Sequence, residues 1–266
     1  MDRRNFLKTG GIALLGSLTT GSAMALATPG ALGGEGADKK ATVALAMNHF
    51  GVSEADLKKV LAAALEKGGD YADLFFEHTI TNSIRLMDGA VNNSYSNIDY
   101  GVGVRVLIGD QSGYAYVENI TLEDMLKAAR TAARIASANK GNKPLNLTEK
   151  VLKKNYYTVA SPWEEVSLKD KMPYLQKLND QIFALDKRVH KVQASQSDTT
   201  SHIFFCNSEG VMFYDYRPMV TLGAVCIMEE NGRTENGYAA RAYRRGFDFL
   251  SDEVVDVIAR EAVDLI

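Results

Sequence analysis

Alternating apolar and polar positions predict a β-hairpin between Tyr100 and about Glu118. The first strand runs to Ile108, a Gly-Asp-Gln-Ser-Gly turn follows, and the second strand begins at Tyr114. One face of the first strand is apolar, and the other face carries Gly101, Gly103, Arg105 and Leu107. Because the two glycines leave the backbone bare, we expect a helix, a ligand or another chain to approach it there.

Helices are predicted on both sides of this hairpin. Ser53 begins one helix and Gly68-Gly69 ends it. Thr121 begins a second helix with an unusually small inward side, made of Leu122, Met125, Ala129, Ala132, Ala133 and Ala136. Since small side chains permit close approach, we expect this helix to pack against Gly101 and Gly103. Strands are predicted at Tyr71–His78, Ser83–Met87 and Ala90–Tyr95, the last two joined by Asp88-Gly89.

The second half of the chain repeats this mixture of helices and strands. A helix is predicted from Ser167 to about Lys187, with Met172, Leu175, Leu178, Ile182 and Leu185 inward and Pro173 as a kink or the true start. An antiparallel meander follows, and a last helix begins at Ser251. The predicted strands of the meander are Val189–Ser195, His202–Asn207, Val211–Tyr216, Val220–Glu229 and Tyr238–Tyr243.

This order predicts an α+β fold: antiparallel or mixed sheets with helices packed on one face. Residues 138–146 have the composition of a loop and separate two sub-domains, residues 42–140 and 147–266. The last helix is still amphipathic at Ile266, without a glycine, a capping residue or a polar tail. We therefore expect the natural protein to continue beyond this residue.

The first 25 residues have the pattern of a twin-arginine export signal. Asp2-Arg3-Arg4-Asn5-Phe6-Leu7-Lys8 precedes an apolar run from Gly10 to Leu18, and small-x-small cleavage sites end at Ala25 and Ala27. The run is shorter than the ~20 residues of a membrane-spanning helix, so no stable membrane anchor is expected. Residues 26–41 are predicted to be a flexible leader, and the mature protein is expected to be periplasmic or extracellular.

Composition and charge restrict the class of partner. The 266 residues are 46% hydrophobic and 24% charged, with a formal net charge of -3, which is ordinary for a globular protein. Without a long basic run, nucleic acid is not an expected partner. The two cysteines, Cys206 and Cys226, each fall in an apolar strand-like run. This favours free buried thiols, and a disulfide bridge between them in an oxidising compartment is the alternative.

No set of residues in the sequence predicts a catalytic or metal centre. The four histidines are His49, His78, His190 and His202, and none begins a His-Glu-x-x-His or His-Glu-x-x-x-His motif. Glu77-His78 and Ser201-His202 are neighbours on strands, so the members of each pair point to opposite faces and are interpreted as ordinary strand residues.

Glycines and arginines do not add such a centre. Gly101-x-Gly103 lacks the third glycine of a dinucleotide fingerprint. Arg241, Arg244 and Arg245 are interpreted as a solvated face. Arg105 shares the glycine face, and we expect it to pair with a carboxylate inside the fold, with contact to a peptide or a partner subunit as the alternative.

Several of these segments together resemble the TldD/PmbA family, and more narrowly its TldD branch. Asp70–Glu77, the Met87-Asp-Gly-Ala-Val91 hairpin and Gly101-Val-Gly-Val-Arg105 with Gly113-Tyr-Ala115 resemble the family's N-terminal domain. Asp198–Gly210, Arg217-Pro218 and Ile258-Ala-Arg-Glu-Ala262 are similar to its middle region. The resemblance covers about residues 50 to 266.

The resemblance implies zinc-dependent peptidases. A TldD-type subunit carries a His-Glu-x-x-x-His helix and a later Cys ligand, and it pairs with a PmbA-type (TldE) subunit that lacks zinc. Unfolded peptides enter a cavity between them. The older family name, modulator of DNA gyrase, implies an indirect link only. By this resemblance zinc belongs to the full-length protein, and this chain binds none. Gly101, Gly103 and Arg105 are the residues proposed to contact a peptide or the partner, which is a paralogous subunit or a second copy.

Three interpretations follow. The first is the N-terminal and middle portion of a TldD-like zinc metallopeptidase, forming a cavity wall and a subunit interface and inactive alone. The second is a non-catalytic peptide-binding or partner subunit of such a complex. The third is an unrelated α+β binding protein. The coding sequence downstream of Ile266 discriminates between them, because only the first requires an in-frame His-Glu-x-x-x-His.

Overall fold

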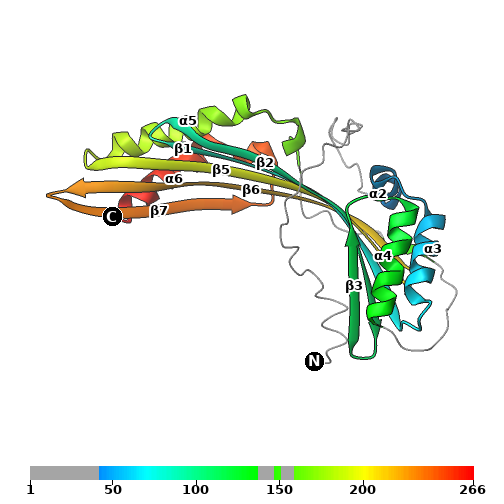
Figure 1. The fold of residues 1–266 in the computed structure, drawn as a ribbon. Coiled ribbons are helices and arrows are strands. Elements are labelled where there is room, and N and C mark those ends of the chain that lie inside the picture. Colours follow the sequence, from blue (N-terminus) through cyan, green and yellow to red (C-terminus); the bar gives the residue numbers. More distant parts are fainter. Residues whose placement is uncertain (1–41, 137–146, 151–158) are drawn as a thin grey trace. The chain divides into compact units, whose positions relative to one another are not determined.

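The computed structural model describes residues 42–136, 147–150 and 159–266, and the predictions made for residues 1–41 and 138–146 lie outside this part. Figure 1 shows the elements in chain order. These are α2 (Val43–Phe50), α3 (Glu54–Leu65), β1 (Tyr71–Met87), β2 (Ala90–Ile108), β3 (Gln111–Val117), α4 (Leu122–Ile135), β4 (Thr148–Glu149), the 3₁₀ turn η1 (Trp163–Glu165), α5 (Leu168–Leu185), β5 (Val189–Asn207), β6 (Val211–Glu230), β7 (Arg233–Tyr243), the 3₁₀ turn η2 (Phe247–Phe249) and α6 (Asp252–Asp264).

The strands form one seven-stranded sheet. Its order is β3-β2-β1-β5-β6, and both β7 and the short β4 pair with β6. All pairs are antiparallel except β4 with β6. The predicted α+β class, with helices packed on one face, is therefore confirmed. The sub-domain limits at residues 42–140 and 147–266 stay a prediction, since strands from both ranges share this sheet.

Two hydrophobic cores lie on the same face of the sheet. Their residues are even-numbered in β1 and β6 and, beyond a bulge near Val189, also in β5, as expected for side chains that alternate between faces. Helices α2, α3 and α4 cover the first core, around Phe76 and Phe204. Helices α5 and α6 cover the second, around Ile182 and Leu222. Strands β1, β5 and β6 contribute to both.

Strands β1, β2, β5 and β6 are each longer than predicted. The sequence pattern divides every one of them in two, but in the structure each runs without interruption for 17 to 20 residues. Segments 79–82 of β1 and 198–201 of β5, interpreted as breaks, are paired with each other between the two cores. Here the covered face carries polar side chains, all buried except the partly buried Asn82, which we call the polar belt: Asn82, Gln196, Asp198, Thr200 and His202. Each of these side chains has a hydrogen-bond partner, described below, although Gln196 Oε1 has none among the described residues. The polar composition therefore does not produce a turn.

Local signals place the turns and caps where they were predicted. Asp88 and Gly89 have φ of 50° and 79°, which fits a two-residue hairpin turn. The side chains of Ser53, Thr121 and Ser251 cap α3, α4 and α6. Pro173 lies inside α5 and does not mark its start, because Ser167 and Asp170 form a capping box before it. Leu185, predicted to point inward, is 45% exposed at the end of α5.

The expected packing of α4 on Gly101 and Gly103 is wrong. A Cβ atom added at Gly113 of β3 would lie 2.0 Å from the Ala132 carbonyl oxygen of α4, so the helix makes its close approach there. At Gly103 the nearest atoms belong to the Tyr114 ring, and at Gly101 to the backbone of Val117 and Glu118. The helix lies on the face to which Gly113 belongs. The bare glycines are on the other face, where a tyrosine fills the space.

Cys206 and Cys226 are buried free thiols in different cores. Cys206 pairs with Met212 across β5 and β6, whereas Cys226 pairs with Val192. Along β6 the two positions are about 45 Å apart at about 3.3 Å per residue, far beyond disulfide geometry. Among the described helices, none combines the length and the apolar character needed to cross a bilayer.

Candidate functional site

The other face of the sheet, to which the odd-numbered side chains of β1 and β6 point, carries no packed helix in the part of the chain that the structure describes. We call it the open face. At its centre, hydroxyl groups of β1 and β5 lie within hydrogen-bond distance of one another: Thr79 Oγ1 is 2.8 Å from Ser201 Oγ, and Thr81 Oγ1 is 3.1 Å from Thr199 Oγ1. Thr79 Oγ1 also donates to Glu77 Oε1 at 2.7 Å. These four side chains are uncharged, but Glu77 bonds to Thr79, and Asp99 and Arg217 are the strand partners of Thr79 and Ser201, so this region of the face carries charges of both signs.

Aromatic side chains cross one end of the open face in strand register. Tyr116, Gly103, Phe75, Phe205 and Phe213 are successive partners across β3, β2, β1, β5 and β6. We call these five positions the aromatic row. Phe205 and Phe213 stack with ring centroids 5.0 Å apart. The gap at Gly103 is covered by Tyr114, which is 47% exposed, and Tyr116 is 52% exposed. The row is therefore an apolar strip that solvent reaches on a helix-free face.

Arg105 lies in the next row of the same face and pairs with a carboxylate, as predicted. Its Nη2 and Nε donate to Asp73 Oδ2 at 2.6 and 2.9 Å. The Asp73 side chain is 5% exposed, and burial raises its pKa even though Arg105 opposes this effect. The guanidinium is thus committed to neutralising a buried acid. Contact of Gly101, Gly103 or Arg105 with a peptide or partner stays a prediction.

Three of the four histidines meet on the covered face, and we call His49, His78 and His202 the histidine cluster. His49 Nε2 of α2 lies 2.9 Å from His78 Nδ1 of β1. His78 and His202 are direct partners across β1 and β5. The His49 ring stacks on the His202 ring with centroids 4.5 Å apart. As predicted, His78 and His202 do not act with Glu77 and Ser201, which are on the open face.

Hydrogen bonds fix the orientation of His202. Its Nδ1 lies 2.5 Å from the Tyr214 hydroxyl and its Nε2 lies 3.2 Å from Glu164 Oε1. A neutral phenol donates to Nδ1, so the proton of a neutral His202 ring is on Nε2 and faces the carboxylate. The other Glu164 oxygen accepts from Thr200 Oγ1 at 3.2 Å and from Tyr216 OH at 3.0 Å.

Burial and repulsion by neighbouring charge disfavour the charged forms of His49 and His78. Burial, then the charges of His202 and His78, lower the pKa of His49 to about 4, with Glu164 opposing. Burial and His202 also lower the pKa of His78. Burial would raise the pKa of Glu164, but its hydrogen bonds to His202 and Tyr216 and the charge of His202 outweigh burial and hold that pKa low. The cluster therefore faces one ionised carboxylate, with the imidazoles of His49 and His78 neutral at pH 7.

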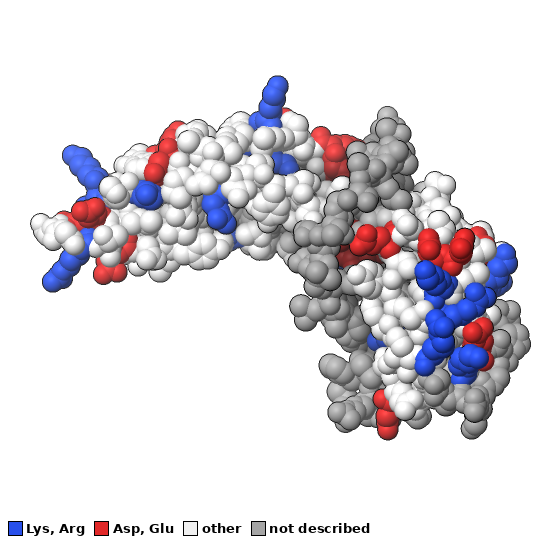
Figure 2. Space-filling model, in the orientation of Figure 1, with Lys and Arg blue, Asp and Glu red and all other residues white. Residues whose placement is uncertain are grey.

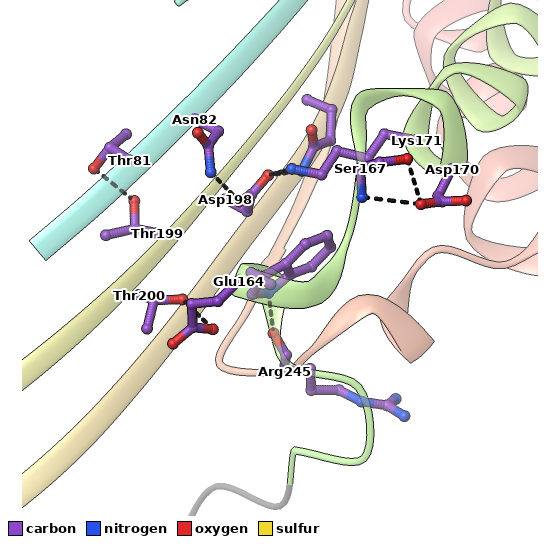
Figure 3. Close-up of polar contacts among 12 residues, drawn as sticks. Thr81, Asn82, Glu164, Ser167, Asp170, Lys171, Asp198, Thr199, Thr200 and Arg245 are labelled. Atoms are coloured by element: carbon purple, nitrogen blue, oxygen red, sulfur yellow. Dashed lines mark hydrogen bonds and ion pairs between the residues drawn. The ribbon is translucent and has the colours of Figure 1, made fainter. Parts of the chain in front are cut away.

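The polar belt continues from the cluster to a buried ion pair, shown in Figure 3. Lys171 Nζ of α5 lies 2.5 Å from Asp198 Oδ2, and the two side chains are 4% and 1% exposed. Asn82 and Gln196 each donate to Asp198 at 3.0 Å. The Lys171 ammonium also lies 5.4 Å from the centroid of the Trp163 ring. This belt joins η1 and α5 to the middle of β5.

The described residues do not fit a zinc ion. No group of three His, Cys, Asp or Glu side chains in residues 42–136, 147–150 and 159–266 is arranged to hold a metal. Two zinc-bound nitrogens at about 2.0–2.1 Å from the metal are about 3.3 Å apart in a tetrahedral site. His49 and His78 bring their nitrogens to 2.9 Å, and both nitrogens of His202 have other partners. The cluster is a hydrogen-bonded stack.

The cluster could not be predicted because helix α2 was not predicted. Its signal is present: Val43, Ala46 and Phe50 follow helical spacing and are buried, and Thr42 caps the helix. The helix has 8 residues, and it directly follows the Gly- and Ala-rich segment 26–41, which was predicted to be a flexible leader. To predict that His78 pairs with His202, the register between β1 and β5 has to be known, and no local sequence pattern indicates this register.

Charged side chains of both signs are mixed on the molecular surface. Figure 2 shows Lys and Arg interspersed with Asp and Glu over α3 and α4, where Lys58 pairs with Glu54 at 2.6 Å. Two of the arginines that were interpreted as a solvated face form ion pairs: Arg241 pairs with Glu261, and Arg245 pairs with Asp248.

Comparison with known proteins assigns the two halves to one family. The model of the PmbA/TldA metallopeptidase domain 1 matches residues 72–136, and the model of the PmbA/TldA metallopeptidase central domain matches residues 161–266. The chain is 32% identical over 204 residues to the metalloprotease TldD homolog of Haemophilus influenzae, covering 73% of this chain and 42% of that protein. It is 26% identical over 207 residues to the homolog of Buchnera aphidicola from Acyrthosiphon pisum, covering 78% and 43%.

Solved structures share the fold. A proposed modulator of DNA gyrase from Thermotoga maritima superposes with a TM-score of 0.63 at 20% identity, over 80% of this chain and 47% of that one. TldE from Thermococcus kodakarensis superposes with a TM-score of 0.59 at 16% identity, over 79% and 46%. The chain spans less than half the length of each of these relatives. Matches to both family models, in the family's order, show that this chain belongs to the PmbA/TldD metallopeptidase family.

Proposed function

We propose that this chain is the N-terminal and central portion of a TldD-like zinc metallopeptidase that degrades unfolded peptides. In this proposal the chain forms part of the wall of the substrate cavity and of a subunit interface, with a paralogous subunit or a second copy as partner. The zinc-binding residues lie outside the described part. The twin-arginine pattern supports export to the periplasm, which fractionation of cells expressing the full-length protein would test.

The observation that carries the proposal is the open face. Its aromatic row offers apolar contact to any side chain, and the hydroxyls of Thr81, Thr199 and their neighbours can bond to main-chain amides. Such a surface suits a chain with exposed backbone and varied side chains. The half-exposed Tyr116 is the most accessible member of the row. Gly103 is the strand partner of Tyr116, and Arg105 lies in the neighbouring row.

A binding experiment tests this role. The probe is a fluorescent, reduced and alkylated polypeptide, which has no fold of its own. We expect Tyr116→Ala to weaken its binding to the 266-residue chain roughly 5- to 30-fold, because truncating a contact tyrosine costs about 1–2 kcal/mol. Tyr95→Ala is the matched control: Tyr95 is 56% exposed, on the same face, but outside the row. Equal affinities of the two variants would contradict the proposed contact surface.

The same samples test whether this chain binds the polypeptide without hydrolysing it. With zinc added, the chain alone should bind the polypeptide without cleaving it, since hydrolysis requires three protein ligands, an open coordination position and a base. Cleavage that a chelator abolishes would contradict this expectation. The downstream coding sequence separates the proposal from the alternative, a non-catalytic peptide-binding or partner subunit. An in-frame His-Glu-x-x-x-His supports the peptidase, and a stop codon directly after Ile266 supports the alternative.

A further inference from the structure

Among the described residues, ionisable side chains of α2 contact the polar belt and its neighbours only in the histidine cluster. His49 is in the last turn of α2, while His78 and His202 belong to the sheet beneath it. The helix is otherwise held by Val43, Ala46 and Phe50, whose side chains enter the first core. Phe50 lies 5.5 Å from Phe76 between ring centroids.

The short contact between His49 and His78 requires a free lone pair. At 2.9 Å between Nε2 and Nδ1, one nitrogen donates a proton and the other accepts it. If both rings are protonated, two N–H groups face each other and the hydrogen bond is lost. Protonation also places like charges in contact, because the His49 ring stacks on both His78 and His202.

Few neighbouring charges can compensate for this protonation. The titratable groups that surround the His49 ring are His78 and His202 of the sheet and Glu164 of η1. Three tyrosines of β2 and β6, named at the end of this paragraph, contact the His78 or His202 ring. Glu164 is the single carboxylate among the described residues that contacts an imidazole of the cluster, so it balances one added proton. Glu149 accepts from the Val43 amide at 3.3 Å, at the opposite end of α2. Burial raises the pKa of each phenol, which keeps them neutral: Tyr100, Tyr214 and Tyr216.

We propose that His49, His78 and His202 form a pH-sensitive latch, which holds α2 on the sheet at neutral pH and loosens it on acidification. The proposal is independent of the peptidase role. When α2 detaches, His49 returns to the ordinary imidazole pKa near 6.5, whereas burial and neighbouring charge lower the pKa of docked His49 to about 4. Between these values the detached state binds more protons than the docked state. Docking is therefore favoured at higher pH and weakens as pH falls through this window.

Hydrogen–deuterium exchange of the 266-residue chain measures this loosening. Because the apolar contacts of α2 remain, the detached state stays a minor one, and exchange detects such rare openings. After correction for the intrinsic effect of pH, we expect protection of residues 43–50 to fall on the order of tenfold between pH 7.5 and pH 5.0. Protection of α4, which has no histidine, serves as the internal reference. Unchanged protection of residues 43–50 overturns the proposal.

Variants connect the effect to the cluster. His49→Gln keeps a polar side chain but cannot take up the proton, so the fall should disappear. The control His190→Gln removes a histidine that is 62% exposed and pairs with Glu229 outside the cluster, and it should leave the fall intact. If His49→Gln leaves α2 unprotected at both pH values, the variant His78→Gln provides the test instead. A fall in the protection of residues 43–50 that is at least threefold smaller than in the parent chain supports the latch. A full-sized fall in either variant overturns it.

Discussion

Replacing Asp198 with alanine should lower the free energy of unfolding by about 3–5 kcal/mol. The substitution leaves Lys171 as a buried ammonium whose side chain is 4% exposed, 5.4 Å from the Trp163 ring and without its counter-ion. It also removes the acceptor for the amides of Asn82 and Gln196. Guanidinium unfolding of the variant and the parent chain measures the difference.

Two further variants separate the interaction from the loss of a partner. Lys171→Met with Asp198→Leu removes both charges and should recover most of the loss, because an apolar pair of similar size carries no desolvation penalty. Lys177→Met is the control on the same helix, since Lys177 pairs with Asp252 at 2.8 Å but is 38% exposed. It should change stability by at most about 1 kcal/mol. A loss below about 1 kcal/mol for Asp198→Ala would show that Lys171 finds water or another partner.

Gly113→Ala should destabilise the protein by about 1–3 kcal/mol, at the upper end of the range. The new Cβ atom would lie 2.0 Å from the Ala132 carbonyl oxygen and 2.9 Å from the Ala136 nitrogen. Both obstacles are backbone atoms, so α4 has to move away from β3 and its contacts around Met125 and Ala129 loosen.

Ser112→Ala is the control for this substitution. Ser112 is the preceding residue, is exposed and points to the other face of β3, so its loss should change stability by no more than about 0.5 kcal/mol. Thermal and denaturant unfolding of the two variants measure the difference. Equal stabilities would mean that α4 shifts at no cost, which the close packing of its alanine side argues against.

Local structure was predictable from the sequence because its signals are local. The caps at Ser53, Thr121 and Ser251 and the turn at Asp88-Gly89 depend on one to four neighbouring residues. The pairing of Arg105 with a carboxylate was predictable for a different reason, since a guanidinium on a partly buried face requires one.

Strand length and the site were not predictable in the same way. The segment Asp198-Thr-Thr-Ser has the composition of a turn, and it is extended only because Lys171, Asn82 and Glu164 satisfy its buried side chains. These partners are between 27 and 116 residues away in sequence. The histidine cluster likewise depends on the β1–β5 register and on α2. A pattern of faces identifies Gly103 as bare, but only the structure shows that Tyr114 fills the space.

The continuity of β1 and β5 limits how this protein can be divided or recombined. The two strands share fifteen residue pairs, from Asp73 with Asn207 to Met87 with Gln193, although the matched family regions assign β1 to domain 1 and β5 to the central domain. The first part of β1 enters one core through Phe76, and its last part enters the other through Leu86. Either fragment made by a cut between residues 136 and 161 would lack part of the core that it otherwise forms: Phe204, Cys206, Met212 and Tyr214 in the first core, and Ile84 and Leu86 in the second. A chimera of two relatives joined there has to match the side chains of β1 to those of β5 along all fifteen pairs, so the two sequence domains form one structural unit.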